Sequence, residues 1–353
     1  MSPFARLSIR ICTLLLIFLG SGCMSPTARI PQLHSELISQ EALSQNCDFL
    51  LAESQRSTRI LNTAFPILKA AAELFPAHYR YTLGISLQSD SVIEAPYRQA
   101  ALTLWGDQPS LRISAVAHNA PAGIAGIQVN DRLLAINEIS ALNDLSQSIH
   151  LLHKALAHGN PITLTLEREG QNITLPITPV KTADYRVRLR HKASINARAT
   201  TKQVEINRGM LEFCQNDSEL AYVIAHEIAH IALKHHRDAA INFLTGLIGD
   251  AALWATLIPS PGIIATTTLA AKSESYEIEA DYIALYLLVR AGYAPEEAAQ
   301  FWQRLATIVP IQKSRFKLNF KSHPDLPTRQ ILFEQTLNEI QNNPHLKPLF
   351  KSR

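Results

Sequence analysis

The pattern His226-Glu227-Ile228-Ala229-His230 constrains the fold of this chain more than any other stretch. Two histidines four residues apart face the same way only on an α-helix, where four residues turn by about 400° and rise by about 6 Å. On such a helix both imidazoles can hold one Zn²⁺ ion, and Glu227 can reach a metal-bound water. The pattern therefore predicts a helix on which His226 and His230 bind the metal and Glu227 is the catalytic base.

The residues around this pattern favour a helix. Asn216 to Glu219 form a variant capping box, with Asn216 as the N-cap and Glu219 at the third helical position. A buried face is predicted by apolar residues at helical spacing: Leu220, Val223, Ile224 and Ile231. On a continued helix His235 would be turned about 140° from His230, so we expect His235 and His236 to be exposed and without a role.

A tetrahedral catalytic zinc needs a third protein ligand and one open position. Glu277 is the best candidate, because it begins a second helical pattern in which Asp281 follows four residues later on the same face. Glu277 can then bind the metal while Asp281 orients a ligand histidine. Ala280 is small enough to let the two helices approach each other. The alternative interpretation is a solvated acidic helix face.

Together the two segments resemble the HtpX and CAAX-prenyl-protease family of zinc metallopeptidases. In that family a helix bearing HExxH precedes a helix bearing ExxAD, and Glu277, Ala280 and Asp281 match the second pattern. The resemblance covers roughly residues 185–335, in the family's order. It implies a mainly α-helical zincin-type metallopeptidase domain with a small β-sheet over residues 182–353, with one Zn²⁺ per chain.

The same resemblance extends to Ser322-His323-Pro324 and to Arg329. It implies that His323 lies near the zinc, where it stabilises the tetrahedral oxyanion or occupies the open position, and that Arg329 fixes the loop. An ordinary surface histidine is the alternative. Glycines and prolines interrupt the nearly uncharged stretch 239–271, which predicts a hairpin of helices at the site or a loop that dips into a membrane.

Residues 80–181 combine short strand-like runs with one helical stretch, 143–157. The runs are Tyr81–Leu87, Leu111–Val116, Arg132–Ile136, Ile162–Glu167 and Ile173–Thr178, the last two joined by a hairpin turn at 169–172. Ala120–Ile127 followed by Asn130–Asn137 resembles a bacterial PDZ domain, which implies a small, partly open β-barrel with one or two helices. Asn130 stands where that family has glycine and tolerates the same positive-φ turn. A bound peptide is the implied partner, and a spacer or regulatory role is the alternative.

The first 22 residues predict a signal peptide. Arg6 and Arg10 precede the apolar run Ile11–Gly20, which is short for a membrane-spanning helix. The small residues before Cys23 resemble a lipoprotein signal, which implies a lipid anchor on Cys23 in the periplasm. Met24 in place of Asp favours the outer membrane. Plain secretion and an uncleaved anchor are the alternatives.

Residues 23–79 predict a tether and then helices, which Pro66 kinks or divides. Cys47 and Cys214 remain once the signal is processed, and they either form a disulfide or stay as two buried thiols. A length of 353 residues predicts two or three domains. The formal net charge of +3 argues against a nucleic-acid partner.

Two functions from different classes fit these features. The first is a zinc metalloendopeptidase acting on unfolded or envelope proteins, in which the strand predicted at Gln203–Asn207 holds the substrate by edge pairing. The second is a periplasmic chaperone or outer-membrane protein assembly factor with a latent zinc site, which His323 would favour by blocking the metal. A prenyl-peptide protease fits less well, because an exported lipoprotein would not meet prenylated substrates.

Overall fold

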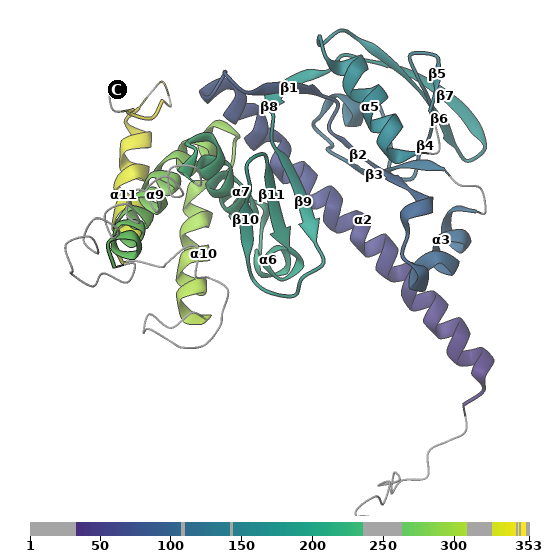
Figure 1. Cartoon of the computed structure of the whole chain (residues 1–353), viewed down its shortest axis with the longest axis horizontal. Helices are drawn as coiled ribbons and strands as arrows, with labels where there is room; N and C mark the ends of the chain where they lie inside the picture. Colours follow the sequence, from purple (N-terminus) through teal and green to yellow (C-terminus); the bar gives the residue numbers. More distant parts are fainter. Residues whose placement is uncertain are drawn as a thin grey trace, which may run out of the picture. The chain divides into compact units, whose positions relative to one another are not determined.

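The computed structural model describes residues 33–106, 110–141, 144–235, 263–308, 327–343, 345 and 347–350. The chain divides into two units, Met1–Gln45 and Asn46–Arg353. Described residues of the first unit form the beginning of helix α2 (Ser35–Leu74), which continues into the second unit. The second unit holds the strands and the other described helices (Figure 1).

Helix α2 continues through Pro66, so of the two predicted effects of this residue, a kink or a division into two helices, the division is wrong. The buried residues of α2 begin at Ile60. Ile67, Leu68 and Ala71 lie in the larger hydrophobic cluster of the second unit. Burial of this apolar surface on both sides of the proline offsets the backbone hydrogen bond that the proline removes.

A six-stranded antiparallel sheet follows, in the order β2-β3-β4-β6-β7, with β5 paired to β4. Its strands are β2 (Ile85–Ser89), β3 (Leu111–Val116), β4 (Arg132–Ile136), β5 (Ile139–Ser140), β6 (Ile162–Arg168) and β7 (Gln171–Ile177). Leu152 and Leu156 of helix α5 (Leu145–Leu156) join the sheet's own hydrophobic cluster. The predicted strands from residue 111 onward and the predicted helix are confirmed, whereas helices α3 (Arg98–Trp105) and α4 (Pro121–Ile124) were not predicted.

The turns of this sheet depend on positive φ angles. Asn130 has φ 73°, as predicted, and the β6–β7 turn has φ 51° at Glu169 and 76° at Gly170. The predicted strand Tyr81–Leu87 is instead divided at Gly84, which has φ 76°. A Cβ atom on Gly84 would lie 2.1 Å from the Cβ of Ala120, so this position requires glycine for its φ angle and for its close packing.

Two smaller sheets lie beside the large one. The first uses the strand before Gly84, and the second is formed by the chain beyond the large sheet. β1 (Tyr79–Thr82) pairs with β8 (Val180–Ala183) at the two ends of the large-sheet segment. A three-stranded sheet has the order β10-β11-β9, formed by β9 (Arg186–Arg190), β10 (Ala197–Ala199) and β11 (Gln203–Asn207). Packed with it are α6 (Arg208–Phe213), α7 (Asp217–Ala232), α9 (Ile263–Arg290), α10 (Pro295–Ile308) and α11 (Pro327–Gln341). Helices around a small sheet agree with the predicted fold class.

Strand β11 lies in the middle of the three-stranded sheet. It pairs with β10 on one side and with β9 on the other. Because both of its edges are used, the prediction that β11 holds a substrate by edge pairing is wrong. Within the described ranges β10 has a partner on one side alone, and it packs against helix α7.

Helix α2 contacts both parts of the second unit. Ser54 Oγ donates to the Ser114 carbonyl in β3 at 2.7 Å. Five residues later on the same helix, Arg59 donates to the Leu211 and Cys214 carbonyls, both at 3.2 Å, and to Asp217 at 2.9 Å. The helix therefore joins the six-stranded sheet to the start of the helical part.

The two cysteines are not paired with each other. Cys47 and Cys214 are both free thiols, and burial raises the pKa of Cys214 to about 12. Of the stretch 239–271, residues 239–262 lie outside the described residues, and the remainder begins α9. In the described part of the chain, no helix combines the length and apolar character needed to cross a membrane.

Candidate metal centre

Helix α7 begins as the sequence predicts. The Asn216 side chain accepts a hydrogen bond from the backbone N–H of Glu219 at 2.9 Å. The carboxylate of Glu219 reaches one residue further back than in a regular capping box, accepting from the backbone N–H of Gln215 at 2.8 Å, and also pairs with Arg304 of α10. The helix is buried over nearly its whole length, so its histidines lie inside the protein.

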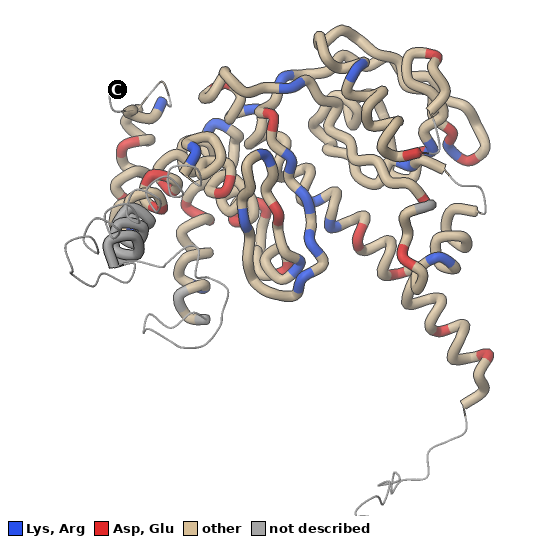
Figure 2. Tube along the Cα trace, in the orientation of Figure 1, with Lys and Arg blue, Asp and Glu red and all other residues tan. Residues whose placement is uncertain are grey.

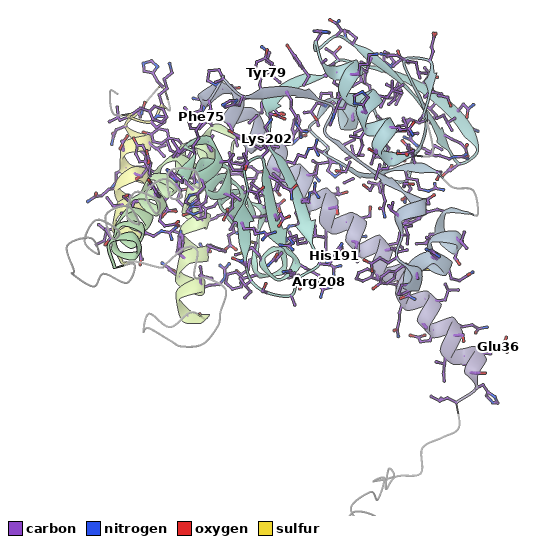
Figure 3. The ribbon with its side chains drawn as sticks, viewed as in Figure 1. Glu36, Phe75, Tyr79, His191, Lys202 and Arg208 are labelled. Carbon is purple, nitrogen blue, oxygen red and sulfur yellow. The ribbon has the colours of Figure 1, made fainter. Side chains whose placement is uncertain are left out.

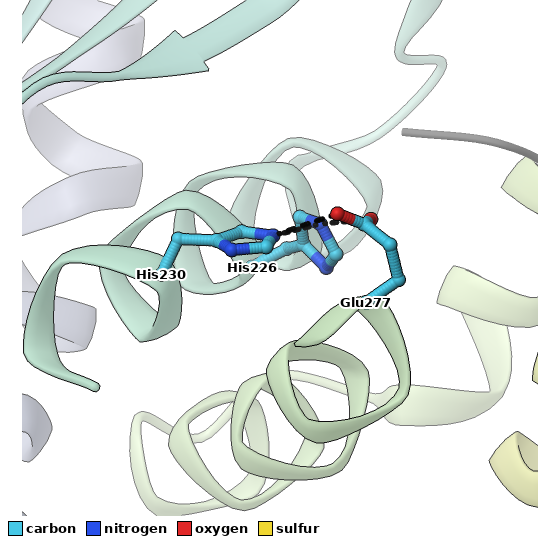
Figure 4. Close-up of side chains that lie close together, drawn as sticks. All are labelled: His226, His230 and Glu277. Carbon is cyan, nitrogen blue, oxygen red and sulfur yellow. Dashed lines mark hydrogen bonds and ion pairs between the residues drawn. The ribbon is translucent and has the colours of Figure 1, made fainter. Parts of the chain in front are cut away.

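The three predicted ligands lie together, with side chains from α7 and α9 pointing toward one another (Figure 4). His226 Nε2 lies 3.1 Å from His230 Nε2. The Glu277 oxygens lie 3.3 Å from His226 Nε2 and 3.3 Å from His230 Nε2. All three residues are buried, and Ala280 is fully buried one turn after Glu277, where α7 and α9 pack.

These distances fit a metal ion in tetrahedral coordination. Nitrogen and oxygen ligands at about 2.0–2.2 Å from zinc stand about 3.3–3.6 Å apart at tetrahedral angles. The observed separations of 3.1 and 3.3 Å are close to that value. Two imidazole nitrogens and a carboxylate make a donor set that zinc prefers. Among the described residues, these three form a candidate metal site, one ligand fewer than tetrahedral coordination uses.

Asp281 lies beside the cluster and holds one ligand histidine. Its Oδ1 accepts from His226 Nδ1 at 2.8 Å and from the Tyr222 hydroxyl at 2.5 Å. Arg329 of α11 donates to both Asp281 oxygens, at 2.6 and 2.8 Å. With Nδ1 donating to the carboxylate, the Nε2 lone pair of His226 faces the cluster.

Burial by itself would raise the pKa of Asp281, but Arg329 and His226 outweigh it and hold the pKa well below the usual range. Burial would likewise lower the pKa of His226, but Asp281 and Glu277 raise it to about 9. Arg329 also lies 3.4 Å from Glu277 and stacks over the Trp302 ring at 4.3 Å. Arg329 and His226 therefore compensate the buried charge of the two carboxylates together.

The prediction that His235 is exposed is wrong. Helix α7 ends at Ala232, and Lys234 has a left-handed φ of 63°, so the chain turns back and buries His235. His235 Nδ1 lies 3.0 Å from His230 Nδ1, and its Nε2 lies 3.2 Å from Glu279. Since His230 directs Nε2 to the cluster, its Nδ1–H donates to His235, which donates in turn to Glu279.

The sequence offers little sign that His235 is buried. Its ring stacks on Tyr276 of α9, with centroids 4.5 Å apart, and burial lowers its pKa although Glu279 opposes this. A neutral His235 can accept a hydrogen bond from the Nδ1–H of His230. The left-handed turn could have been suspected only from the end of the apolar pattern at Ile231. His236 lies outside the described residues.

The remaining predicted residues divide into two groups. Glu227 is buried between the two histidines on α7, and Arg329 is buried beside Asp281. His323 and Cys23 lie outside the described residues. A cavity of about 490 Å³ adjoins the site and is lined by His230 and Ile231 together with residues 184–185 and 200–202.

A buried histidine pair one turn apart, completed by a glutamate from a second helix, defines the zincin class of metallopeptidase site. Residues 165–333 match the family model Peptidase family M48, and residues 82–178 match the PDZ domain model. The chain thus has a region that matches the PDZ domain model, followed by a region that matches Peptidase family M48 and contains the candidate zinc site.

Known proteins are similar to parts of this chain. Mitochondrial metalloendopeptidase OMA1 of Saccharomyces cerevisiae is 34% identical over 108 residues, which is 30% of this chain and 31% of that protein. The beta-barrel assembly-enhancing protease of Escherichia coli strain K12 is 30% identical over 118 residues, which is 29% of this chain and 24% of that protein. The chain therefore spans about a quarter to a third of the length of these relatives. A solved PDZ domain of HtrA3, bound to a phage-derived ligand, has a TM-score of 0.24 at 22% identity, covering 30% of this chain and 89% of that domain.

Proposed function

We propose that this chain is a zinc-dependent endopeptidase that hydrolyses unfolded or envelope proteins at the periplasmic face of the cell envelope. The observation that carries the proposal is that His226, His230 and Glu277 are buried together. Their imidazole Nε2 atoms and carboxylate oxygens lie 3.1 and 3.3 Å apart. The M48 match over residues 165–333 supports it. Within that family, Ala280 and Asp281 after Glu277 favour the HtpX and CAAX-prenyl-protease branch.

In this mechanism His226, His230 and Glu277 hold one Zn²⁺, which when bound polarises the scissile carbonyl and makes a water molecule acidic enough to ionise near neutral pH. The carboxylate of Glu227 takes a proton from the attacking water and returns it to the leaving amine. Asp281 keeps the proton of His226 on Nδ1, so that Nε2 remains a ligand atom.

We infer that β10, and not β11, holds the substrate main chain. The Thr200 N–H donates to the Gln203 carbonyl, so these two residues form a hydrogen-bonded pair of the β10–β11 hairpin. From this pair, non-hydrogen-bonded and hydrogen-bonded pairs alternate along the two strands. The N–H and C=O groups of Ala197 and Ala199 then point to the outer edge of β10. An extended peptide can pair with that edge beside α7.

Glu227→Gln tests the reaction. The variant removes the base but no ligand, so it should keep its zinc and lose cleavage of casein, a substrate without a stable fold, by a factor of at least about 100. Metal analysis and a casein assay on the purified protein check both parts. Cleavage at the wild-type rate would rule out the mechanism, and loss of zinc would show that Glu227 has a ligand role.

We also propose that the PDZ domain binds an extended peptide at β2. Strand β2 ends the six-stranded sheet and pairs with β3 alone among the described strands, while α5 contacts it from the side. A peptide added there would lie between β2 and α5. Failure of peptides with free carboxyl ends to bind the protein in titrations would contradict this assignment.

Two proposals concern residues outside the described part. Cys23 is proposed as a lipid anchor at the outer membrane, so Cys23→Ser should move the chain from the membrane fraction to the soluble periplasm; unchanged fractionation would refute it. His323 is proposed to lie near the zinc. His323→Ala should raise casein cleavage if the histidine blocks the open position and lower it if the histidine stabilises the oxyanion, whereas an unchanged rate would exclude both roles.

A second function is favoured by the name of one relative, the beta-barrel assembly-enhancing protease of Escherichia coli. In this alternative the chain assists assembly of outer-membrane proteins and its zinc site is latent. Complementation of a deletion strain separates the two functions. Full rescue by Glu227→Gln would make client binding the main activity, and no rescue would make cleavage the main activity.

A further inference from the structure

The three-stranded sheet of β9, β10 and β11 has two unlike faces. Side chains alternate between the faces along each strand. One face packs into the hydrophobic cluster shared with the helices, through Val187 and Leu189 of β9 and Val204 and Ile206 of β11. The other face, which we call the basic face, points away from that cluster. It carries Arg186, Arg188 and Arg190 of β9, Arg198 of β10, and Gln203 and Glu205 of β11.

The basic face holds one carboxylate among four arginines. The strand register places Glu205 across from Arg198 on one side and from Arg188 on the other. Glu205 pairs with Arg198 at 2.6 Å and with Arg190 at 3.0 Å. Burial would raise the pKa of Glu205, but these two arginines outweigh it and lower the pKa. Arg186 and Arg188 have no ion pair within the described ranges, so the face keeps an excess of positive charge.

This excess is local to one part of the chain. Residues 181–208 contain eight lysines and arginines and two carboxylates, whereas the whole chain has a formal net charge of +3, so the remainder is net negative. Figure 2 shows the basic character of β9. Figure 3 labels Lys202 at one end of the sheet and His191, directly after β9, at the other. A surface of one sign on a chain of nearly balanced charge favours an anionic partner.

The strand β10 forms one border of the basic face. As its pairing with β11 alternates, the main-chain groups of Arg198 point toward β11, and those of Ala197 and Ala199 point outward. The Arg198 side chain stands on the basic face between the two alanines and is 52% exposed. It donates to Glu205 through Nε, and within the described ranges its two terminal nitrogens make no hydrogen bond. Arg198 therefore borders the edge at which a peptide strand can add.

A strand added at this edge brings its own side chains to the basic face. In antiparallel pairing, hydrogen bonds to Ala197 and Ala199 place the residue across from Arg198 in a non-hydrogen-bonded pair, with Cα atoms about 4.5 Å apart. Opposite charges in such a pair attract, and like charges repel. Thr200, two residues after Arg198, lines the cavity beside His230. The residue across from Arg198 therefore lies near the candidate metal site.

We propose that the basic face selects acidic polypeptide segments, with Arg198 as the specificity-determining residue. The added strand places Asp or Glu across from Arg198, whose terminal nitrogens bind the carboxylate. Arg188 and Arg190, two strands away, add attraction over a longer range. The inference rests on the proposed function, because it takes β10 as the strand that holds the substrate. A lipid surface is a poorer match, since headgroups have no main chain to pair with Ala197 and Ala199.

Binding of blocked peptides tests this selection without depending on cleavage. The protein is the full chain with zinc and with Glu227→Gln, which removes the catalytic base. The probe is the fluorescein-labelled peptide Gly-Ser-Glu-Thr-Glu-Thr-Glu-Ser-Gly, amidated so that it has no free carboxyl end, and a second peptide has lysine in place of each glutamate. Fluorescence anisotropy measures both dissociation constants. The glutamate peptide should bind at least about fivefold more tightly than the lysine peptide.

Variants of Arg198 assign this preference to one residue. Arg198→Gln should lower the ratio of the two dissociation constants by about two- to fivefold, and Arg198→Lys, which retains the charge, should keep it. The matched control is Arg132→Gln, because Arg132 forms a cross-strand pair with Glu167 at 3.1 Å in the large sheet, outside the basic face. Its loss should change the ratio by less than about twofold. Matching thermal unfolding curves verify that the variants are folded.

A third peptide, with proline in place of both threonines, keeps the charge but cannot donate these main-chain hydrogen bonds to β10. It should bind about fivefold more weakly or worse than the threonine peptide. Equal binding would show a general anion surface of the kind a lipid headgroup uses, and would overturn the proposal. Equal affinity for the glutamate and lysine peptides, an unchanged ratio in Arg198→Gln, or no binding of any peptide would overturn it as well. These outcomes are separate from the proposed activity, since absence of casein cleavage by the wild-type protein contradicts the endopeptidase while binding to Glu227→Gln needs no cleavage.

Discussion

The two histidines of the candidate metal site are held by different partners. His226 donates to Asp281, a buried carboxylate that Arg329 clamps. His230 instead faces a neutral histidine, His235, whose second nitrogen lies at the half-exposed Glu279. A carboxylate acceptor raises the basicity of a ligand imidazole more than a neutral one does. We therefore expect His226 to be the stronger donor and the contact with His235 to decide how well His230 is oriented.

Replacing His235 by phenylalanine tests this contact. Phenylalanine keeps a ring against Tyr276 but removes both nitrogens. The dissociation constant for zinc should rise about 10- to 100-fold, because an outer-shell partner of a metal ligand is lost. Competition with a chromogenic chelator at neutral pH measures this constant. As a control, Glu279→Gln keeps an acceptor for the His235 N–H and should have a smaller effect; equal affinity for all three proteins would reduce His235 to a packing residue.

Zinc uptake should also release a proton. In the metal-free protein the pKa of His226 is about 9, and a ligand histidine must be neutral. The apparent zinc affinity should therefore fall by about tenfold for each pH unit below about 9. The raised pKa stabilises the metal-free fold below the unfolded value of 6.5, and this contribution is lost as the pH rises through about 9. Calorimetry in two buffers of different ionisation enthalpy measures the protons released, and a count of zero would contradict the prediction.

Among the elements, the division of one strand at Gly84 decides how the PDZ domain is attached. The residues before Gly84 join β1, and those after it join β2. The alternating pattern of 81–87 predicted one strand, because periodicity does not reveal which backbone another segment approaches. The contact with Ala120 is formed only after folding.

Gly84→Ala measures this close approach. The alanine would need a left-handed φ, which costs about 1–2 kcal/mol, and its Cβ would overlap Ala120, which costs about 1–3 kcal/mol more. Gly170 is a matched control, since it has the same φ of 76° as Gly84 but nothing within 4 Å of an added Cβ. Gly170→Ala should therefore show the φ cost alone. Urea unfolding of both variants compares the losses, and equal losses would show that the Ala120 contact is relieved without cost.

At the scale of the whole molecule, the two ends of the PDZ domain are joined to the rest of the chain by one short pair of strands, β1 and β8. Thr82 lies opposite Val180 where β1 and β8 meet, and each domain has its own hydrophobic cluster. Segments whose ends lie close together can be removed without dismantling the rest of the fold.

Replacing residues 83–179 by Asn-Gly should turn β1 and β8 into a hairpin and leave a folded peptidase domain that binds zinc. Stability should fall, because Phe65 of α2 loses its contacts with Ala117 and Ala120. Circular dichroism and metal analysis check the fold and the zinc content. An aggregated, zinc-free product would show that the peptidase domain depends on the PDZ domain.

The sequence by itself determined the local part of the candidate site. Helical spacing places His226, Glu227 and His230 on one helix, and the cap at Asn216 fixes where that helix begins. Such features depend on interactions between residues close in the chain. The meeting of Glu277 with this pair was inferred from family order, since no local rule brings two distant helices together.

Tertiary structure alone decided the features that depend on long-range packing. His235 became a partner of His230 because α7 ends and turns back, and β11 lost its expected role because β9 pairs with its other edge. A cavity lined by Arg80 and Arg186 exists because residues about 100 positions apart in the chain lie around one space. Periodicity and spacing report how a segment presents its own faces, but the partner of each face is fixed only when the whole chain packs.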